Sequence, residues 1–166
     1  LTVDGLLSGG GGVAAGSTTE VSVSGRGGVP VGAGAAVLNV TVVDAGAAGF
    51  VTVFPCGQAV PNASNLNVAA GQTVPNAVVS KLGVGGTVCV FSSVSAHVLV
   101  DVNGSFPSVS DYASLVPARL FDSRAPGLTV DGLLSGGGRV AAGSTTEVSV
   151  SRSEERRVGK ECERAC

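Results

Sequence analysis

One stretch of this chain occurs twice, as residues 1–24 and again as residues 128–151. The two copies are identical except where Gly12 corresponds to Arg139, so the period of the repeat is the distance from Leu1 to Leu128. Near-identity over this length does not arise by chance, and a fixed period is the mark of a repeat architecture. The period matches the size of one β-sandwich domain. The sequence therefore predicts a tandem array of single-domain units.

The two copies differ in what precedes them. Residues 115–127, LVPARLFDSRAPG, precede the second copy and are named here the opening segment, whereas the first copy begins at Leu1. We expect residues 1–107 to form a β-sandwich unit without its opening segment, residues 108–114 a linker, and residues 115–151 the truncated start of a second repeat. Alternatively, the opening segment folds back and completes the first unit. In that case residues 1–24 already occupy the positions in the first unit that residues 128–151 would take, so we expect the second copy to be the less ordered one.

Residues 152–166 have a different composition from the rest of the chain. Most of them are charged, whereas charged residues are sparse throughout residues 1–151. Residues 152–162, RSEERRVGKEC, resemble an in-frame translation of a common sequencing-adapter DNA. We therefore interpret residues 152–166 as a non-native charged tail and leave them out of the fold prediction. The alternative is a natural charged tail.

Composition excludes two classes of partner. The chain has 166 residues, 44% hydrophobic and 13% charged, with 26 glycines and a net charge of −2. No basic cluster is present, so nothing indicates nucleic-acid binding. Mean hydropathy is +0.44, but Asn, Gln, Pro and Gly interrupt every apolar stretch well before the roughly 18 residues that a membrane span requires. We predict neither a nucleic-acid partner nor a membrane span.

Alternation of apolar and polar residues predicts β-strands throughout the first unit. Leu38, Val40 and Val42 share one face of their strand, and Asn39 and Thr41 lie on the other. The predicted strands are residues 19–24, 37–43, 50–55, 64–68, 73–82, 87–92 and 96–102, with residues 119–123 as an eighth. Pro75 indicates an edge strand or a bulge. The fold class predicted is an all-β, antiparallel two-sheet sandwich of immunoglobulin-like or jelly-roll topology with about seven or eight strands.

Two cysteines remain once Cys162 and Cys166 are assigned to the tail. Cys56 and Cys89 each lie in a strand pattern and share a face with phenylalanine, which allows their sulfur atoms to meet. A disulfide between them would stabilise the fold by roughly 3 to 4 kcal/mol. It predicts an oxidising compartment, secreted or at the cell surface. The alternative is a pair of buried free thiols in a reducing cell.

The sequence also resembles a known repeat. Its motifs are Pro117-Ala118-Arg119, Asp122-Ser123-Arg124, LNVT at 38–41, GFVTVFP at 49–55, ASNLN at 63–67, GQTVPN at 71–76 and DVNGSF at 101–106. Together they are similar to a tandem β-sandwich repeat of secreted and surface-exposed proteins of actinobacteria and related bacteria. The resemblance implies an extracellular accessory module, of the kind appended to cell-wall hydrolases, peptidases or large surface proteins. It implies no ligand.

Nothing in the sequence predicts catalysis. His97 is the single histidine, and Asp101, four residues along the same predicted strand, lies about 13 Å away, too far for a hydrogen bond. One histidine and a bridged cysteine pair do not complete a zinc site. We therefore predict no enzyme activity, no metal and no cofactor, and interpret His97 as an exposed strand residue.

Charge is concentrated in the opening segment. Arg119, Asp122 and Arg124 lie together, and Asp101 is the acid of the closing strand. We expect Arg119 or Arg124 to form a structural ion pair with Asp101, tying the first strand of a repeat to the last. The alternative is that these arginines and Asp122 form a binding patch.

We expect a non-catalytic structural or interaction repeat: a spacer, stalk or surface-attachment unit of a larger secreted or cell-wall-associated bacterial protein. Its partners would be neighbouring repeat units, cell-wall glycan or another surface protein. The alternative is a carbohydrate- or peptidoglycan-binding module. Absence of tryptophan and the presence of one tyrosine, Tyr112, disfavour sugar stacking. The remaining candidates for polar glycan binding are Asn62, Asn65, Asn67 and Asn76.

Overall fold

Seven strands make up the regular structure of the chain. The structure is a computed structural model that describes residues 2–7 and 9–150. The strands are β1 (Ser17–Ser22), β2 (Ala33–Val43), β3 (Gly49–Pro55), β4 (Leu66–Val68), β5 (Val74–Lys81), β6 (Thr87–Ser92) and β7 (His97–Pro107). The described residues form no helix, and so they hold no helix of the length and apolarity needed to cross a bilayer.

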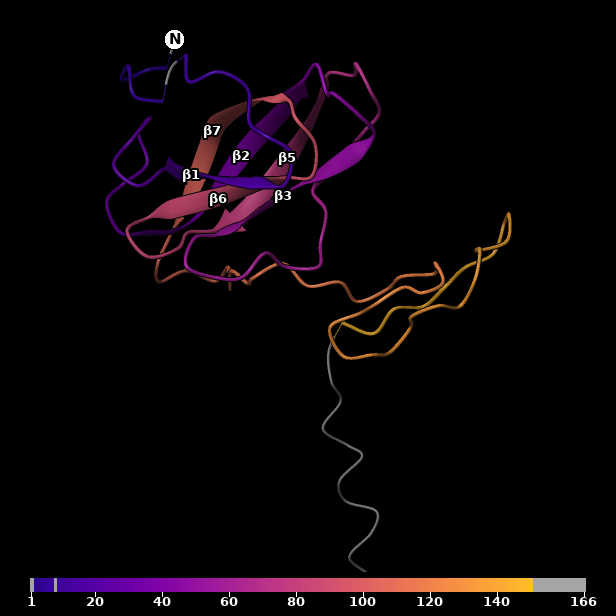
Figure 1. Ribbon diagram of the computed structural model, residues 1–166. Helices are drawn as coiled ribbons and strands as arrows, with labels where there is room; N and C mark the ends of the chain where they lie inside the picture. Colours follow the sequence, from indigo (N-terminus) through magenta and orange to yellow (C-terminus); the bar gives the residue numbers. More distant parts are fainter. Residues whose placement is uncertain (1, 8, 151–166) are drawn as a thin grey trace, which may run out of the picture. The chain divides into compact units, whose positions relative to one another are not determined.

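The strands pair into two antiparallel sheets. One has four strands in the order β1-β6-β3-β4, and the other has three in the order β5-β2-β7. Figure 1 shows the sheet with β1, β6 and β3 in front of the sheet with β7, β2 and β5. The predicted all-β two-sheet sandwich is confirmed. Contacts divide the chain into two compact units, Leu1–Ala118 and Arg119–Cys166, and all seven strands belong to the first.

Valines on alternate positions fill the space between the sheets. Leu38, Val40 and Val42 of β2 are at most 1% exposed, whereas Asn39 and Thr41 on the other face are half-buried. The four-stranded sheet contributes Val51, Val53, Val88 and Val90 to the same core. Burying a valine side chain stabilises the folded state by about 1.5 kcal/mol or more. The alternation of these valines thus accounts for both the strands and their packing.

Two strand predictions, one for Pro75 and one for residues 119–123, have different outcomes. Pro75 lies in β5, which is an edge of its sheet, so the edge-strand interpretation is confirmed. Proline is tolerated there because an edge strand leaves one row of backbone amides unpaired. Residues 119–123 do not form the eighth strand, because their ladder is limited to one isolated bridge between Asp122 and Ser135. Backbone hydrogen bonds join this segment to residues 130–138 at four places, but they do not form a continuous ladder.

The second copy of the repeat has the same turns as the first. Gly9 and Gly136 both have φ of 72°, and Gly11 and Gly138 both have φ of 83°. Asp4 accepts the amide of Leu6 at 3.1 Å, and Asp131 accepts the amide of Leu133 at 3.0 Å. Positive φ is the region that glycine adopts without steric cost. These turns are therefore encoded locally, by the residues of the copy itself.

The two copies differ in burial. In the first copy Val23 is 5% exposed, whereas its counterpart Val150 is 82% exposed. Residues 17–22 form β1 and pair with β6, but residues 144–149 form no strand. The sequence of this strand is therefore insufficient without its partner strand. Residues 152–166, interpreted above as a non-native tail, lie outside the described residues.

Candidate functional site

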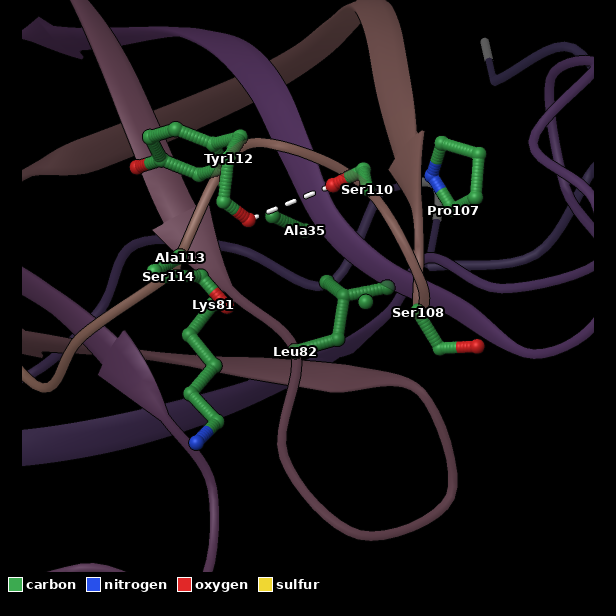
Figure 2. A pocket seen from close by; sticks show the side chains of 10 residues that line it. Ala35, Lys81, Leu82, Pro107, Ser108, Ser110, Tyr112, Ala113 and Ser114 are labelled. Carbon is green, nitrogen blue, oxygen red and sulfur yellow. Dashed lines mark hydrogen bonds between the residues drawn. The ribbon is translucent and has the colours of Figure 1, made fainter.

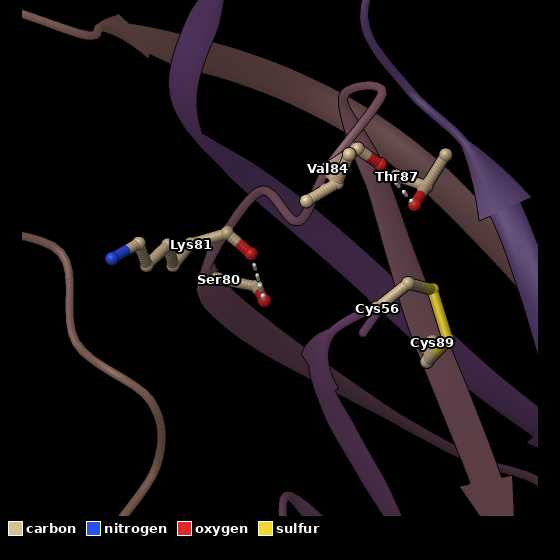
Figure 3. Close-up of a disulfide and its surroundings, with 6 residues drawn as sticks. All are labelled: Cys56, Ser80, Lys81, Val84, Thr87 and Cys89. Carbon is tan, nitrogen blue, oxygen red and sulfur yellow. Dashed lines mark hydrogen bonds between the residues drawn. A yellow bond between two sulfur atoms is a disulfide. The ribbon is translucent and has the colours of Figure 1, made fainter. Parts of the chain in front are cut away.

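A disulfide joins the two cysteines of the sandwich. Cys56 follows the last residue of β3, and Cys89 lies in β6, with their Cα atoms 4.9 Å apart (Figure 3). The predicted pairing is confirmed. Cys56 is 7% exposed and Cys89 is 9% exposed, and both pack with the buried ring of Phe54 and the half-buried ring of Phe91. The sulfurs meet because β3 pairs with β6 in a register that sets Phe54 opposite Cys89, one residue pair from the end of the ladder.

One acid lies beside this disulfide. Glu20 of β1 is directly opposite Cys89 in the strand register, and its carboxylate lies within 4.8 Å of both sulfurs. Among the described residues these three side chains form the one cluster with metal-ligating atoms so close together. Both sulfurs are bonded to each other, so neither is a thiolate available to a metal. In this oxidised state Glu20 is the remaining ligand of the cluster.

The candidate asparagines Asn65, Asn67 and Asn76 bond to the protein itself. Asn65 accepts the amide of Val53 at 2.7 Å, and its carbonyl accepts the side chain of Asn76 at 2.6 Å. Asn67 accepts the hydroxyl of Ser64 at 3.1 Å. Because Asn65 is bonded to β3 and Asn76 lies in β5, their contact helps to hold the two sheets together. Glycan binding by Asn62, Asn65, Asn67 and Asn76 stays a prediction.

The charges of the opening segment converge on Asp122. Its carboxylate accepts two hydrogen bonds from the Arg124 guanidinium, at 2.8 and 2.7 Å, and one from Arg119 at 3.0 Å. The Asp122 side chain is only 5% exposed. Asp101, which we expected to pair with these arginines, lies exposed on β7 opposite Asn39. A contact of Asp101 with Arg119 or Arg124 stays a prediction.

The environment of Asp122 favours its charged form. Hydrogen bonds from Arg124 lower the pKa of Asp122 well below its usual range, with smaller contributions from the Arg124 backbone amide and the charge of Arg119. A carboxylate that accepts charge-assisted hydrogen bonds binds its proton less tightly. Asp122 therefore acts as an ionised anchor for both arginines and not as an acid or base near neutral pH.

Sequence reasoning did not identify a second ion pair. Asp4 and Arg26 form a bidentate salt bridge within the first unit, and this contact lowers the pKa of Asp4. Arg26 also donates to the carbonyl of Ser22 at 2.8 Å. The pair thus attaches the first turn of the chain to the end of β1. Before residue 118 the sequence contains one arginine, Arg26, and one lysine, Lys81. Because basic residues are so few there, the sequence could have indicated Arg26 as the ion-pair partner of an acid in the first unit.

Figure 2 shows a pocket at the end of the three-stranded sheet. It has a volume of about 380 Å³ and is lined by Gly34, Ala35, Lys81, Leu82, Pro107, Ser108, Ser110, Tyr112, Ala113 and Ser114. Residues 107–114 thus close over the ends of β2 and β5. A Cβ atom at Gly34 would lie 2.8 Å from the Cα of Ser108, so glycine is required for this close approach.

Tyr112 forms one wall of this pocket. Its ring packs against Phe106 with centroids 4.5 Å apart, and the Ser110 hydroxyl donates to the Tyr112 carbonyl at 3.2 Å. Lys81 extends from the opposite side, away from the ring (Figure 2). Within the described residues no carboxylate lies in salt-bridge range of this lysine. An aromatic wall, serine hydroxyls and one ammonium group are suited to a small polar ligand such as a sugar.

His97 is at the start of β7 and is exposed, paired across the strands with Val43. It lies where the sequence placed it, four residues before Asp101 on the same strand. Comparison with protein-family models, with curated proteins and with solved structures found no match to this chain.

Proposed function

We propose that this chain is a non-catalytic structural repeat module, a spacer or attachment unit of a larger secreted or cell-surface protein. The observation that carries the proposal is the recurrence at Leu128 of the sequence that begins at Leu1, with the same turns in both copies. A unit that repeats its own local structure adds length in equal steps, and neighbouring copies supply several attachment points at once.

The disulfide supports the compartment part of this proposal. Disulfides persist in oxidising surroundings and are rare in the cytosol of most organisms. The Cys56–Cys89 bond closes a loop across β3 and β6 and adds stability to a sheet whose core consists mainly of valine. Such a bond suits a module that functions outside the cell without chaperones.

Small-angle scattering of proteins with one, two and three full periods of the repeat tests the spacer role. We expect the maximum dimension to rise by a constant increment with each period, because each unit has its own core. A maximum dimension that stays the same as periods are added would reject a spacer.

A second candidate function is binding of cell-wall glycan, and the pocket beside Tyr112 favours it. Retention of the chain on insoluble peptidoglycan tests this role. Glycan binding predicts that Tyr112→Ala loses retention while Phe50→Ala, which removes an exposed ring on the other sheet, keeps it. Equal retention of the two variants would reject the pocket as the binding site.

A further inference from the structure

Glu20 places a third potential ligand beside the two sulfurs of the disulfide. Strand β6 lies between β1 and β3, so Cys89 has Glu20 opposite it on one side and Phe54 opposite it on the other. Directly opposed residues of paired strands project to the same face of a sheet. The Glu20 carboxylate thus lies beside Cys89, and this carboxylate and the sulfurs of Cys56 and Cys89 are all within 4.8 Å of one another.

This cluster is separate from the valine core. Both cysteines pack with Phe54 and Phe91 in a small apolar group apart from the core between the sheets. Val88 and Val90, the neighbours of Cys89 along β6, belong to that core instead, because successive residues of a strand project to opposite faces. Breaking the disulfide therefore removes no contact within the valine core.

The Glu20 carboxylate is available to a cation. Across residues 2–7 and 9–150 it takes part in no hydrogen bond and no ion pair, and Arg26, the one arginine of the sandwich, is bound to Asp4. Glu20 is also exposed, whereas both cysteines are buried. A dissolved ion can thus approach the sulfurs from the side of this carboxylate.

Reduction converts the cluster into a set of metal ligands. A phosphine breaks the sulfur–sulfur bond, takes up oxygen from water to become a phosphine oxide, and leaves one hydrogen on each sulfur. A divalent cation then replaces the two thiol protons, which pass to solvent. Thiolates bind zinc at about 2.3 Å and carboxylates at about 2.0–2.2 Å, so ligand atoms on one tetrahedral zinc lie roughly 3.5 to 4 Å apart. Rotation about the Cα–Cβ bonds of Cys56 and Cys89 brings the freed sulfurs to this spacing.

We propose that Cys56, Cys89 and Glu20 form a zinc site in the reduced protein, with water as the fourth ligand. The mixed set favours zinc, because copper(I) prefers sulfur ligands and magnesium and calcium prefer oxygen ligands. Disulfide and metal exclude each other, since both require the same two sulfurs. Glu20 was not a candidate from sequence because it reaches the cysteines only through the pairing of β1 with β6. The site goes beyond the spacer role and does not depend on it.

The test uses the full chain with Cys162→Ser and Cys166→Ser, so that Cys56 and Cys89 are its only sulfurs. The protein is reduced with a phosphine, separated from it without oxygen, and titrated with Co²⁺, a coloured substitute for zinc. We expect thiolate-to-cobalt absorption that saturates at one ion per chain and disappears when Zn²⁺ displaces the cobalt. The oxidised protein should show no such absorption, because a disulfide offers no thiolate.

The repeat provides a matched control for the carboxylate. Glu147 is the counterpart of Glu20 in the second copy and has the same flanking residues, but residues 144–149 form no strand. Glu20→Gln should weaken Zn²⁺ binding by about tenfold or more, at least the loss caused by changing a residue that merely orients a metal ligand. Glu147→Gln should leave the affinity unchanged. Equal affinities in the two variants, or no thiolate–cobalt absorption in the reduced protein, would overturn the site.

A second measurement applies if the reduced protein unfolds without metal. Zn²⁺ that binds only the folded chain stabilises it, so the circular dichroism of the sheets should return or withstand more denaturant when Zn²⁺ is added. Glu20→Gln should require a higher Zn²⁺ concentration for the same effect. A variant with Cys56→Ser and Cys89→Ser should gain nothing from Zn²⁺. Equal stabilisation of this variant and the reduced protein would place the zinc elsewhere and overturn the proposal.

Discussion

Asp122 illustrates what single residues decide in this molecule. Its carboxylate organises the opening segment by bonding to Arg119 and Arg124. Sequence reasoning identified these charges but looked for their partner in Asp101, on the closing strand. The short spacing from Asp122 to each arginine was the signal for a local cluster, since side chains so close along a turn meet without any tertiary contact.

The ion pairs of Asp122 predict an effect of pH. Its pKa in the folded segment is lower than the value of about 3.9 in an unstructured chain. Between the two pKa values the unfolded segment binds more protons, so stability rises with pH in that range. The contribution is present above about pH 4 and is lost as the pH falls toward the folded pKa. The Gly136 amide donates to the Asp122 carbonyl, so its protection factor, the exchange rate of an unstructured peptide divided by its own rate at the same pH, should fall in acid. Asp122→Asn should remove that dependence, and an identical acid response in both proteins would contradict the cluster.

At the scale of elements, the alternation of apolar and polar residues predicts which face of a strand is buried better than it predicts which strands lie next to each other in a sheet. The seven strands and the buried face of β2 follow from apolar periodicity, which is a local property. The strand order β1-β6-β3-β4 does not follow from this periodicity, because it depends on contacts between residues far apart in the sequence. The position of Tyr112 escaped prediction for the same reason: its place beside Phe106 depends on how residues 107–114 pass over the sheet end.

The duplicated strand sequence provides its own control for packing. Val23→Asp places a carboxylate in the core and should reduce the free energy of unfolding by at least about 3 kcal/mol. Val150→Asp makes the same change at a side chain that is 82% exposed and should alter it by less than about 0.5 kcal/mol. Denaturant unfolding of both variants measures the difference. Equal losses would contradict the assignment of the first copy to the core.

At the scale of the whole molecule, one sandwich unit and one further unit share a repeated sequence. The sandwich is held by a valine core, by asparagine contacts between its sheets and by one covalent bond between β3 and β6. Its fold class and this bond could be predicted from sequence. The pocket could not, because it depends on the path of residues 107–114 over the sheet end.

Equilibrium unfolding in denaturant with and without a thiol reductant tests the stapled sandwich most directly. The protein for this test carries Cys162→Ser and Cys166→Ser, so that Cys56 and Cys89 are the only sulfurs that respond. Reduction should lower the free energy of unfolding by roughly 3 to 4 kcal/mol, because it releases the loop between the two cysteines in the unfolded chain. Superimposable unfolding curves for the oxidised and reduced protein would contradict the account.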